Sequence, residues 1–242
     1  MYDLVWSGMA LATFVLLQFV NAPYGRHIEK GWGKEISNRT GWIIMELPSF
    51  LIILYFAISS RQSNYALLLS LFWLVHYFNR SIIFPFRINT LGKKIPLIIA
   101  LSAILFNTIN ACLNGYFFAY LESYDQSSFL QWNFWIGIVV FLFGFYINQR
   151  SDYILMNLRK PGETNYKIPF GFLFKYISCP NHFGEIMQWS GFALMAWNWP
   201  AATFLIWTLA NLLPRSLRHH KWYKENFEEY PKERKAVIPG LL

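Results

Sequence analysis

The sequence predicts an all-α integral membrane protein with seven transmembrane helices, its N-terminus outside and its C-terminus in the cytoplasm. Composition gives the first indication: of 242 residues, 55% are hydrophobic and only 14% are charged, compared with ~25% charged in soluble domains. The second is the distribution of the 21 Lys and Arg residues, because this topology leaves only Arg61 outside. We expect one domain over residues 1–242, since the chain is too short for a bundle and a further domain.

Five stretches are apolar enough to cross a hydrocarbon core of ~30 Å. They cover residues 4–20, 41–60, 62–86, 95–121 and 126–149, and the only Asp, Glu, Lys or Arg residues in them are Glu46 in the second and Arg80 in the third. The first lacks a preceding basic region and a following small-residue cleavage site, so it is predicted to be an anchor rather than a signal peptide.

The last apolar block, residues 186–214, is either one tilted span or a hairpin of two. It would measure roughly 44 Å as a single helix, and Trp197-Asn198-Trp199-Pro200 lies at its middle. The flanking segments 158–182 and 215–242 hold four and seven Lys or Arg residues. Basic loops stay in the cytoplasm, so the block is predicted to cross twice.

Glu46 is the only ionisable residue of the second stretch and the first candidate for function. A carboxylate in hydrocarbon costs about 2.5–3.5 kcal/mol on insertion scales, so it is kept mainly where it faces a cavity, a partner or a reaction. Pro48 cannot donate to the carbonyl of Ile44, which predicts a kink beside the acid. The alternative is a glutamate that extends to the headgroups.

Tyr77 lies in the third stretch, one turn before Arg80. The predicted topology places Glu46 about 8 Å and Tyr77 about 14 Å from the cytoplasmic ends of their helices. Both therefore fall in the inner half of the membrane, where the tyrosine hydroxyl could donate beside the acid. The alternative is that Tyr77 and Arg80 belong to interfacial belts.

A polar stripe follows the fifth stretch. Asn148, Asp152 and Arg159 are spaced by four and seven, which predicts one helical face able to bind ribose hydroxyls and a phosphate. Asn181 is expected to be the N-cap of the sixth helix, whose N-terminus would attract phosphate. Solvated helix ends and simple capping are the alternatives.

A second stripe lies near the C-terminus, where Arg215, His219 and Tyr223 recur every four residues. A positive stripe at a membrane surface suits a polyphosphate, and an amphipathic helix on anionic lipid is the alternative. The chain has no GxGxxG or GxxxxGK[ST] motif, so a nucleotide would bind without a Rossmann or P-loop cradle.

The net charge and the two cysteines argue against a nucleic-acid-binding protein and a metalloprotein. The net charge of +8 comes from loops between apolar spans, so topology explains it better than nucleic-acid binding. Cys112 and Cys179 have neither metal-binding nor redox spacing. We therefore predict no metal site and no nucleic-acid partner.

Several motifs, in this order, resemble the steroid 5-alpha-reductase family, the NADPH-dependent 3-oxo-5-alpha-steroid 4-dehydrogenases of membranes, and the chain resembles a bacterial member. The similarity runs from Tyr24-Gly25-Arg26-His27 almost to the end. Its most specific motifs are Glu46-Leu47-Pro48-Ser49-Phe50, His76-Tyr77-Phe78, Ser151-Asp152-Tyr153-Ile154-Leu155, Leu158-Arg159-Lys160-Pro161-Gly162-Glu163, Gly184-Glu185, Tyr230-Pro231 and Arg234-Lys235-Ala236-Val237-Ile238-Pro239.

The resemblance implies an activity and a set of site residues. Glu46 and Tyr77 would contact the 3-oxo group of a steroid, in a pocket mainly from residues 1–121. NADPH would bind mainly to residues 146–242, and the implied contacts are Asn148, Asp152, Arg159, Asn181, Glu185, Arg215, His219 and Tyr223. Tyr24 and Trp42 match family positions near cofactor and substrate. Phe84 and Lys167 depart from the family pattern, which has tyrosine and arginine there.

The chemistry of enone reduction fits these residues. Hydride delivery to the beta carbon places negative charge on the carbonyl oxygen, which requires hydrogen-bond donors and exclusion of water. Tyr77 and a protonated Glu46 are such donors. The enolate then takes a proton at the alpha carbon, most simply from solvent.

Three other functions fit part of the sequence. A membrane methyltransferase of the isoprenylcysteine or phospholipid type would explain the C-terminal third, but gives Glu46 and Tyr77 no role. A sterol-binding scaffold would not need the polar stripes. Polyprenol and enoyl-CoA reductases reduce related double bonds. We expect a monomer acting on a steroid or another lipophilic enone in a bilayer, either a bacterial inner membrane or the endoplasmic reticulum.

Overall fold

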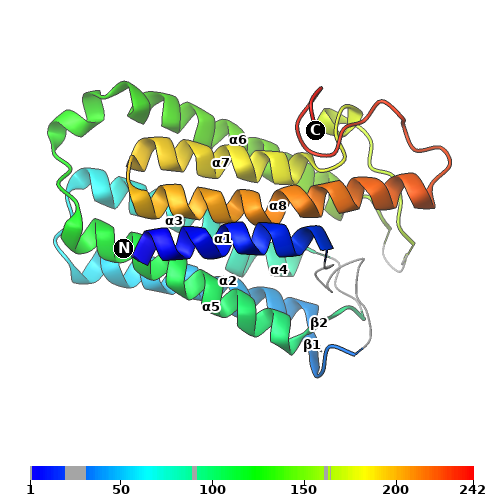
Figure 1. Cartoon of the computed structure of the whole chain (residues 1–242), viewed down its shortest axis with the longest axis horizontal. Helices are drawn as coiled ribbons and strands as arrows, with labels where there is room; N and C mark the ends of the chain where they lie inside the picture. Colours follow the sequence, from blue (N-terminus) through cyan, green and yellow to red (C-terminus); the bar gives the residue numbers. More distant parts are fainter. Residues whose placement is uncertain (1, 20–30, 89–91, 161–162, 164) are drawn as a thin grey trace. The chain divides into compact units, whose positions relative to one another are not determined.

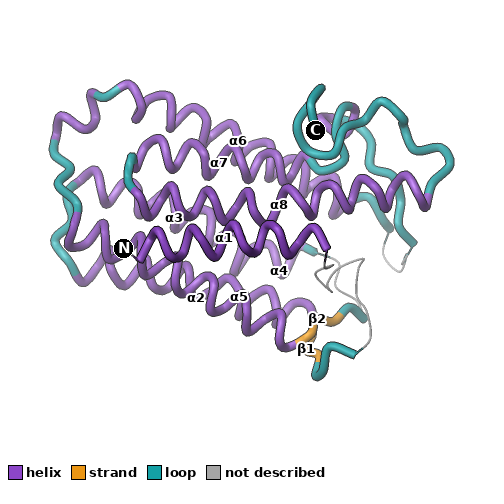
Figure 2. The backbone as a smooth tube through the Cα atoms, viewed as in Figure 1, coloured by secondary structure: helices purple, strands orange, loops and turns teal. Residues whose placement is uncertain are grey.

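The computed structural model (Figure 1) describes residues 2–19, 31–88, 92–160, 163 and 165–242. These residues form two compact units. Unit 1 comprises Met1–Phe19, Ile136–Trp197 and Ala202–Leu242, and unit 2 comprises Val20–Trp135 and Asn198–Ala201. The predicted all-α class is confirmed: the described strands are two three-residue segments, β1 (Glu35–Ser37) and β2 (Lys94–Pro96) (Figure 2).

Three long helices form unit 2. They are α2 (Asn38–Ser59), α3 (Asn64–Phe78) and α5 (Leu97–Tyr116), and α2 packs against both of the others. The α3 helix continues through a π-helical turn, Asn79–Ile83, into α4 (Phe84–Arg87). A π-helical turn at Phe117–Leu121 likewise extends α5, and a 3-10 helix follows at Gln126–Leu130.

Local signals set the ends of these helices. The Ser37 hydroxyl accepts from Thr40 N at 3.1 Å and caps α2, and Ser63 caps α3 in the same way. The α2 helix continues through Pro48 as one element. The antiparallel pairing of β1 with β2 ties the start of α2 to the start of α5.

Basic side chains gather at that same end of unit 2. Arg39 donates to the carbonyl of Pro85 on α4 at 3.1 Å, and Lys94 lies 3.6 Å from Glu35. Arg61 lies at the other end of α2, in the turn before α3. The two ends of unit 2 therefore differ in charge, as the positive-inside rule predicts for a membrane protein.

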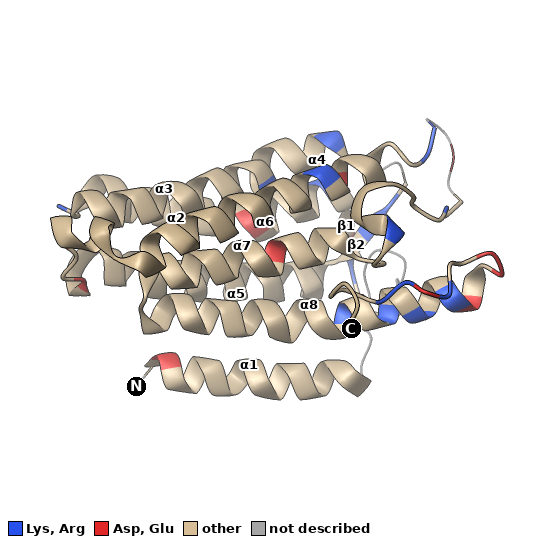
Figure 3. Ribbon diagram, turned by 90° about the horizontal axis from the view of Figure 1, so that it is seen from above, with Lys and Arg blue, Asp and Glu red and all other residues tan. Residues whose placement is uncertain are grey.

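Unit 1 is built from α1 (Tyr2–Phe19), most of α6 (Trp132–Met156), α7 (Pro180–Ala196) and most of α8 (Trp199–Asn226). A ring contact between Trp6 and Trp207, with centroids 4.7 Å apart, holds α1 against α8. A 2.9 Å hydrogen bond between Ser7 and Thr203 joins the same helices. Within α8, the Lys and Arg residues all lie in the C-terminal part of the helix (Figure 3).

The apolar block 186–214 forms the hairpin of two helices. Trp197 ends α7 in the left-handed region with φ of 45°, and Asn198 accepts from Ala201 N at 2.9 Å as α8 begins. The Trp189 and Phe204 rings, with centroids 4.6 Å apart, pack the two helices antiparallel.

Five helical segments of the described residues have the length and hydropathy of membrane spans. They are Tyr2–Phe19, Asn38–Ser59, Asn64–Arg87, Leu97–Leu121 and Trp132–Met156. Many of their large apolar side chains are exposed, among them Val15, Leu51 and Val139, as expected for surfaces in lipid. A multi-pass membrane protein is therefore supported, and the crossings of α7 and α8 stay a prediction.

Candidate functional site

The structure brings Glu46 and Tyr77 together through a third residue, Asn107. Glu46 lies on α2, Tyr77 on α3 and Asn107 on α5, all in unit 2. The Asn107 Nδ2 group donates to Glu46 Oε2 at 3.2 Å, and the Tyr77 hydroxyl donates to Asn107 Oδ1 at 3.3 Å. The predicted acid–tyrosine pair thus shares one amide, which the sequence analysis did not identify.

The Asn107 amide makes two further contacts. Its Nδ2 group donates to the carbonyl of Met45 at 2.6 Å, and its Oδ1 atom accepts from the Ser49 hydroxyl at 3.2 Å. Tyr77 and Asn107 are each 4% exposed and Ser49 is fully buried, whereas Glu46 is half-buried. The polar cluster is therefore largely shielded by α2, α3 and α5.

Aromatic packing and a backbone hydrogen bond fix the position of Tyr77. Its ring stacks on Trp73 with centroids 5.3 Å apart and meets His76 edge-on at 5.1 Å. The Ser81 hydroxyl donates to the Tyr77 carbonyl at 2.6 Å. The π-helical turn begins at Asn79, two residues after Tyr77, and such turns are frequent at functional sites.

Trp42 lies beside Phe84 and Arg80 in the same unit. The rings of Trp42 and Phe84 are 5.0 Å apart, and the Arg80 guanidinium lies over both, at 4.9 Å and 4.7 Å from the centroids. Phe84 therefore keeps an aromatic face where the family pattern has tyrosine, and it lacks only the hydroxyl group. Tyr24, the other aromatic candidate, lies outside the described residues.

The predicted cofactor residues other than Tyr24 and Trp42 fall in unit 1. Asn148, in the last part of α6, donates through Nδ2 to the carbonyl of Asn181 at 3.0 Å and to Glu185 Oε2 at 3.5 Å, both on α7. Asp152 follows one turn later on α6 and is 6% exposed. Asn148, Asn181 and Glu185 thus form one polar cluster where the end of α6 meets the start of α7.

Two predictions, one on the stripe and one on the cap of α7, are wrong. The α6 helix ends at Met156, so Arg159 lies beyond it and is not on one helical face with Asn148 and Asp152. Its guanidinium lies 5.5 Å from the centroid of the Tyr166 ring. Asn181 does not cap α7, because Pro180 occupies the first turn and the cap position falls on Cys179, whose side chain makes no cap hydrogen bond.

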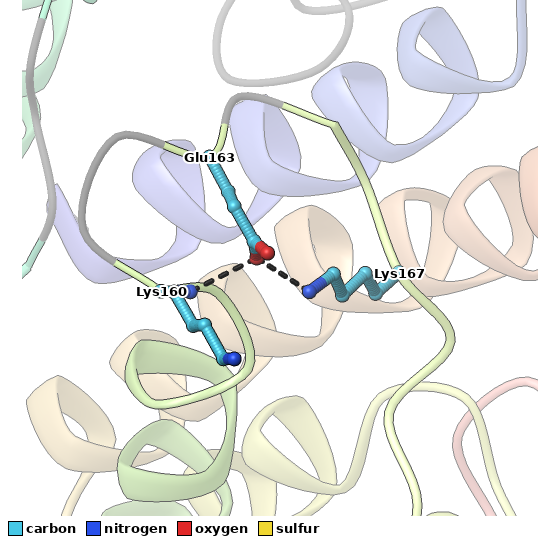
Figure 4. A network of polar contacts seen from close by, with 3 residues as sticks. All are labelled: Lys160, Glu163 and Lys167. Atoms are coloured by element: carbon cyan, nitrogen blue, oxygen red, sulfur yellow. Dashed lines mark hydrogen bonds and ion pairs between the residues drawn. The ribbon is translucent and has the colours of Figure 1, made fainter.

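Lys167, the second departure from the family pattern, is paired within its own loop (Figure 4). Its ammonium contacts Glu163 Oε2, which also accepts from Lys160 N at 3.0 Å. The hydrogen bond from Lys167, followed by that from the Lys160 backbone, lowers the pKa of Glu163. The Lys167 ammonium and the Lys160 N–H group therefore share one carboxylate oxygen of Glu163.

The α8 stripe is present as predicted, with Arg215, His219 and Tyr223 on one helix. The His219 ring lies 5.7 Å from the His182 ring on α7, and His182 Nδ1 lies 2.8 Å from Ser216 Oγ. Tyr223 is 3% exposed. The contact between His219 and His182 thus joins the α8 stripe to the start of α7.

The C-terminal tail completes this region. Ser178 Oγ lies 2.6 Å from His220 Nδ1 and 2.5 Å from the Tyr230 hydroxyl, and it donates to the carbonyl of Lys235 at 3.1 Å. The Tyr230 ring stacks on Tyr223 with centroids 5.2 Å apart and planes inclined by 6°. Tyr230 therefore packs against the α8 stripe. In the sequence, the only sign that this residue matters was the family motif Tyr230-Pro231.

His220 makes this network sensitive to acid. Burial, followed by the charges of Lys224, Lys235 and Arg234, lowers the pKa of His220 from 6.5 to about 4. Between these values the unfolded chain binds a proton that the folded chain does not, so stability should fall as the pH drops from 6.5 to 4. The slope is at most about 1.4 kcal/mol per pH unit, reduced by solvent screening of this half-buried ring.

His220→Asn should therefore show a shallower loss of thermal midpoint between pH 7 and pH 5 than the unaltered protein, measured in detergent. Equal slopes for both proteins would show that His220 does not contribute to the loss of stability at low pH.

Close approach of α6 and α7 requires glycine at four positions: Gly137, Gly144, Gly184 and Gly191. A methyl group at Gly184 would clash with Asn148 N and lie 2.7 Å from the Gly144 carbonyl oxygen. Gly184→Ala should therefore separate the helices, lower stability by about 1–3 kcal/mol and disturb Asn148.

Thermal unfolding in detergent measures this effect. Gly8→Ala on α1 is the matched control, because nothing lies within 4 Å of the added methyl group. Similar midpoints for the two variants would contradict the close packing of α6 on α7.

These features define a helical membrane protein with a buried acid–amide–tyrosine cluster and a separate basic and amide cluster. Within the described part of the chain, no three His, Cys, Asp or Glu side chains could hold a metal ion together. The family description "3-oxo-5-alpha-steroid 4-dehydrogenase" matches residues 93–242. The chain belongs to this family, the steroid 5-alpha-reductases, and is an oxidoreductase.

Full-length relatives support this assignment. The steroid 5-alpha-reductase DET2 of Gossypium hirsutum is 42% identical over 242 residues, covering 96% of this chain and 93% of the relative. DET2 of Arabidopsis thaliana is 43% identical, covering 94% and 90%. The 3-oxo-5-alpha-steroid 4-dehydrogenase 1 of Bos taurus is 41% identical, covering 97% and 93%.

Proposed function

We propose that this protein reduces the delta-4 double bond of 3-oxosteroids with NADPH, giving 5-alpha-3-oxosteroids. The observation that carries the proposal is the convergence of Glu46 and Tyr77 on one amide in a chain of this family. Two oxygen-bearing side chains that can donate protons, held together between three apolar helices, suit a ligand carbonyl in a largely apolar body.

Each side chain has a defined part in the proposed reaction. Tyr77 and a protonated Glu46 donate hydrogen bonds to the 3-oxo oxygen and stabilise the negative charge that develops there. NADPH supplies the hydride that is added to the beta carbon. The helices around the pair exclude water, which strengthens both hydrogen bonds. A solvent-derived proton at the alpha carbon completes the reaction.

The residues of unit 1 fit NADPH chemically. Asn148, Asp152 and Glu185 provide acceptors and an amide for ribose hydroxyls, and the α8 stripe begins with Arg215, a guanidinium suited to phosphate. Asn181, His219, Tyr223 and Arg159 complete the proposed contacts, with Trp42 and Tyr24 near cofactor and substrate. The first N–H groups of α7, which follow Pro180, are a further feature favourable to an anion.

Purified protein should oxidise NADPH when a 4-ene-3-oxosteroid is added, in the absence of a methyl donor. Polyprenal-type and enoyl-CoA substrates form the comparison panel. Oxidation of NADPH with enoyl-CoA but not with the steroid would assign the chain to another branch of the reductases. Methyl transfer without NADPH oxidation would favour the methyltransferase alternative instead.

The proposed topology has seven spans, with the basic ends of both units in the cytoplasm. Cysteines introduced at Asn165 and Trp222, in a background lacking Cys112 and Cys179, should not react with an impermeant reagent added to intact cells. A cysteine at Arg61 is the control and should react. Labelling at Asn165 or Trp222 from outside would rule out this topology.

A further inference from the structure

Asn107 differs from the other polar residues of α5 in its hydrogen bonds. Asn110 donates within its own helix, to the carbonyl of Phe106 at 2.8 Å. Asn114 donates to the carbonyl of Asn110 at 3.0 Å and to that of Pro200 at 3.4 Å. Asn107 instead contacts side chains of both α2 and α3, through Glu46, Ser49 and Tyr77.

The orientation of the Asn107 amide follows from its neighbours. An amide offers two N–H donors and two acceptor positions. The Met45 carbonyl and Glu46 Oε2 occupy the donor side, and the hydroxyls of Ser49 and Tyr77 occupy the acceptor side. Turning the amide over would set its oxygen against the Met45 carbonyl at 2.6 Å without a proton between them, so this arrangement is the stable one.

We propose that Asn107 is a positioning residue, which sets both hydrogen-bond donors of the enone-polarising pair. The inference rests on the proposed function, because Asn107 acts through Glu46 and Tyr77. Its donation to Glu46 Oε2 makes that oxygen an acceptor. Because the carbonyl oxygen of a carboxylic acid is the better acceptor, this contact favours a proton on Oε1, and Asn107 thereby selects which oxygen donates.

The acceptor side of the amide has a second consequence. Tyr77 has one hydroxyl proton, which it directs to Asn107 Oδ1. A substrate carbonyl competes for that proton. When the proton moves to the substrate, Oδ1 keeps the hydrogen bond from Ser49 and is not left unsatisfied in a buried place. Asn107 thus holds the tyrosine without preventing its donation to the substrate.

Asn107→Leu removes both arms of the amide at similar side-chain size. Turnover should fall by about 10- to 100-fold, since small displacements of catalytic groups have effects of this size, while the KM for the steroid changes little. Asn107→Ala is measured in parallel, so that the test does not depend on accommodating the leucine. Asn114→Leu is the matched control: it is the same change on the same helix at a fully buried position.

A mutant cycle separates positioning from packing. Asn107→Leu is introduced into wild-type, Glu46→Gln and Tyr77→Phe backgrounds. A residue that acts through its partners loses effect when a partner is altered, so the fold-loss should be at least about threefold smaller in each variant background. The same fold-loss in all backgrounds, or an equal loss in Asn114→Leu, would overturn the proposal.

Carbonyl polarisation gives a readout that does not depend on turnover. The infrared stretch of a 4-ene-3-oxosteroid labelled with 13C at C3 should shift to lower frequency when bound to wild-type protein. Asn107→Leu should lose most of this shift, and Asn114→Leu should keep it. An unchanged shift in Asn107→Leu would contradict the inference, whereas wild-type protein that neither binds nor reduces the steroid would overturn the proposed function and the inference with it.

Discussion

Glu46→Ala should lower steroid turnover by ~10²-fold or more, because the proposed reaction loses one of its two donors to the developing oxyanion. NADPH binding should persist, since the proposed cofactor contacts other than Trp42 and Tyr24 belong to unit 1 and Glu46 belongs to unit 2. Steady-state kinetics with a 4-ene-3-oxosteroid and a separate NADPH-binding measurement distinguish the two effects.

Glu46→Gln tests whether the acidic proton matters. Glutamine keeps the size and can still accept from Asn107, but its amide is a weaker donor than a carboxylic acid, so turnover should fall here too. Glu35→Ala is the control: Glu35 pairs with Lys94 at 3.6 Å at the end of unit 2 and should leave turnover unchanged. Near-normal turnover in Glu46→Ala, with folding and NADPH binding intact, would return Glu46 to a structural role.

Much of this architecture was predictable because its signals are local. Apolar stretches of about 20 residues with at most one charge predict the candidate spans, and Ser37 and Ser63 cap the helices they precede. The break at Trp197-Asn198 separates α7 from α8, as the predicted hairpin requires, while the membrane crossings of these helices stay a prediction. The predicted topology and helical rise also placed Glu46 and Tyr77 near one another, and both contact Asn107. Their depth in the membrane stays a prediction.

The errors and omissions have physical reasons. Arg159 and Asn181 were placed by spacing rules that hold only inside or at the end of a helix. The α6 helix stops at Met156, and Pro180 moves the start of α7. Asn107 was missed because an uncharged amide does not interrupt an apolar stretch. Its role depends on contacts with α2 and α3 that only the tertiary structure provides.

Arg215→Ala should abolish most of the preference for NADPH over NADH. The extra 2′-phosphate of NADPH gains hydrogen bonds from charged donors, worth roughly 1.5–3 kcal/mol each, and Arg215 begins the α8 stripe. Affinity for NADPH should therefore fall by about 10- to 150-fold, while affinity for NADH changes little. Cofactor titrations of the purified protein, followed by fluorescence, measure both values.

Lys221→Ala is the matched control, because it removes one positive charge from the same helix at an exposed side chain, 3.7 Å from Glu225. A purely electrostatic effect of net charge would weaken NADPH equally in both variants, and salt would screen it. A specific phosphate contact predicts a loss confined to Arg215→Ala. Equal use of NADPH and NADH by the unaltered protein would refute the assignment of Arg215 to the 2′-phosphate, because no preference would then exist for the substitution to remove.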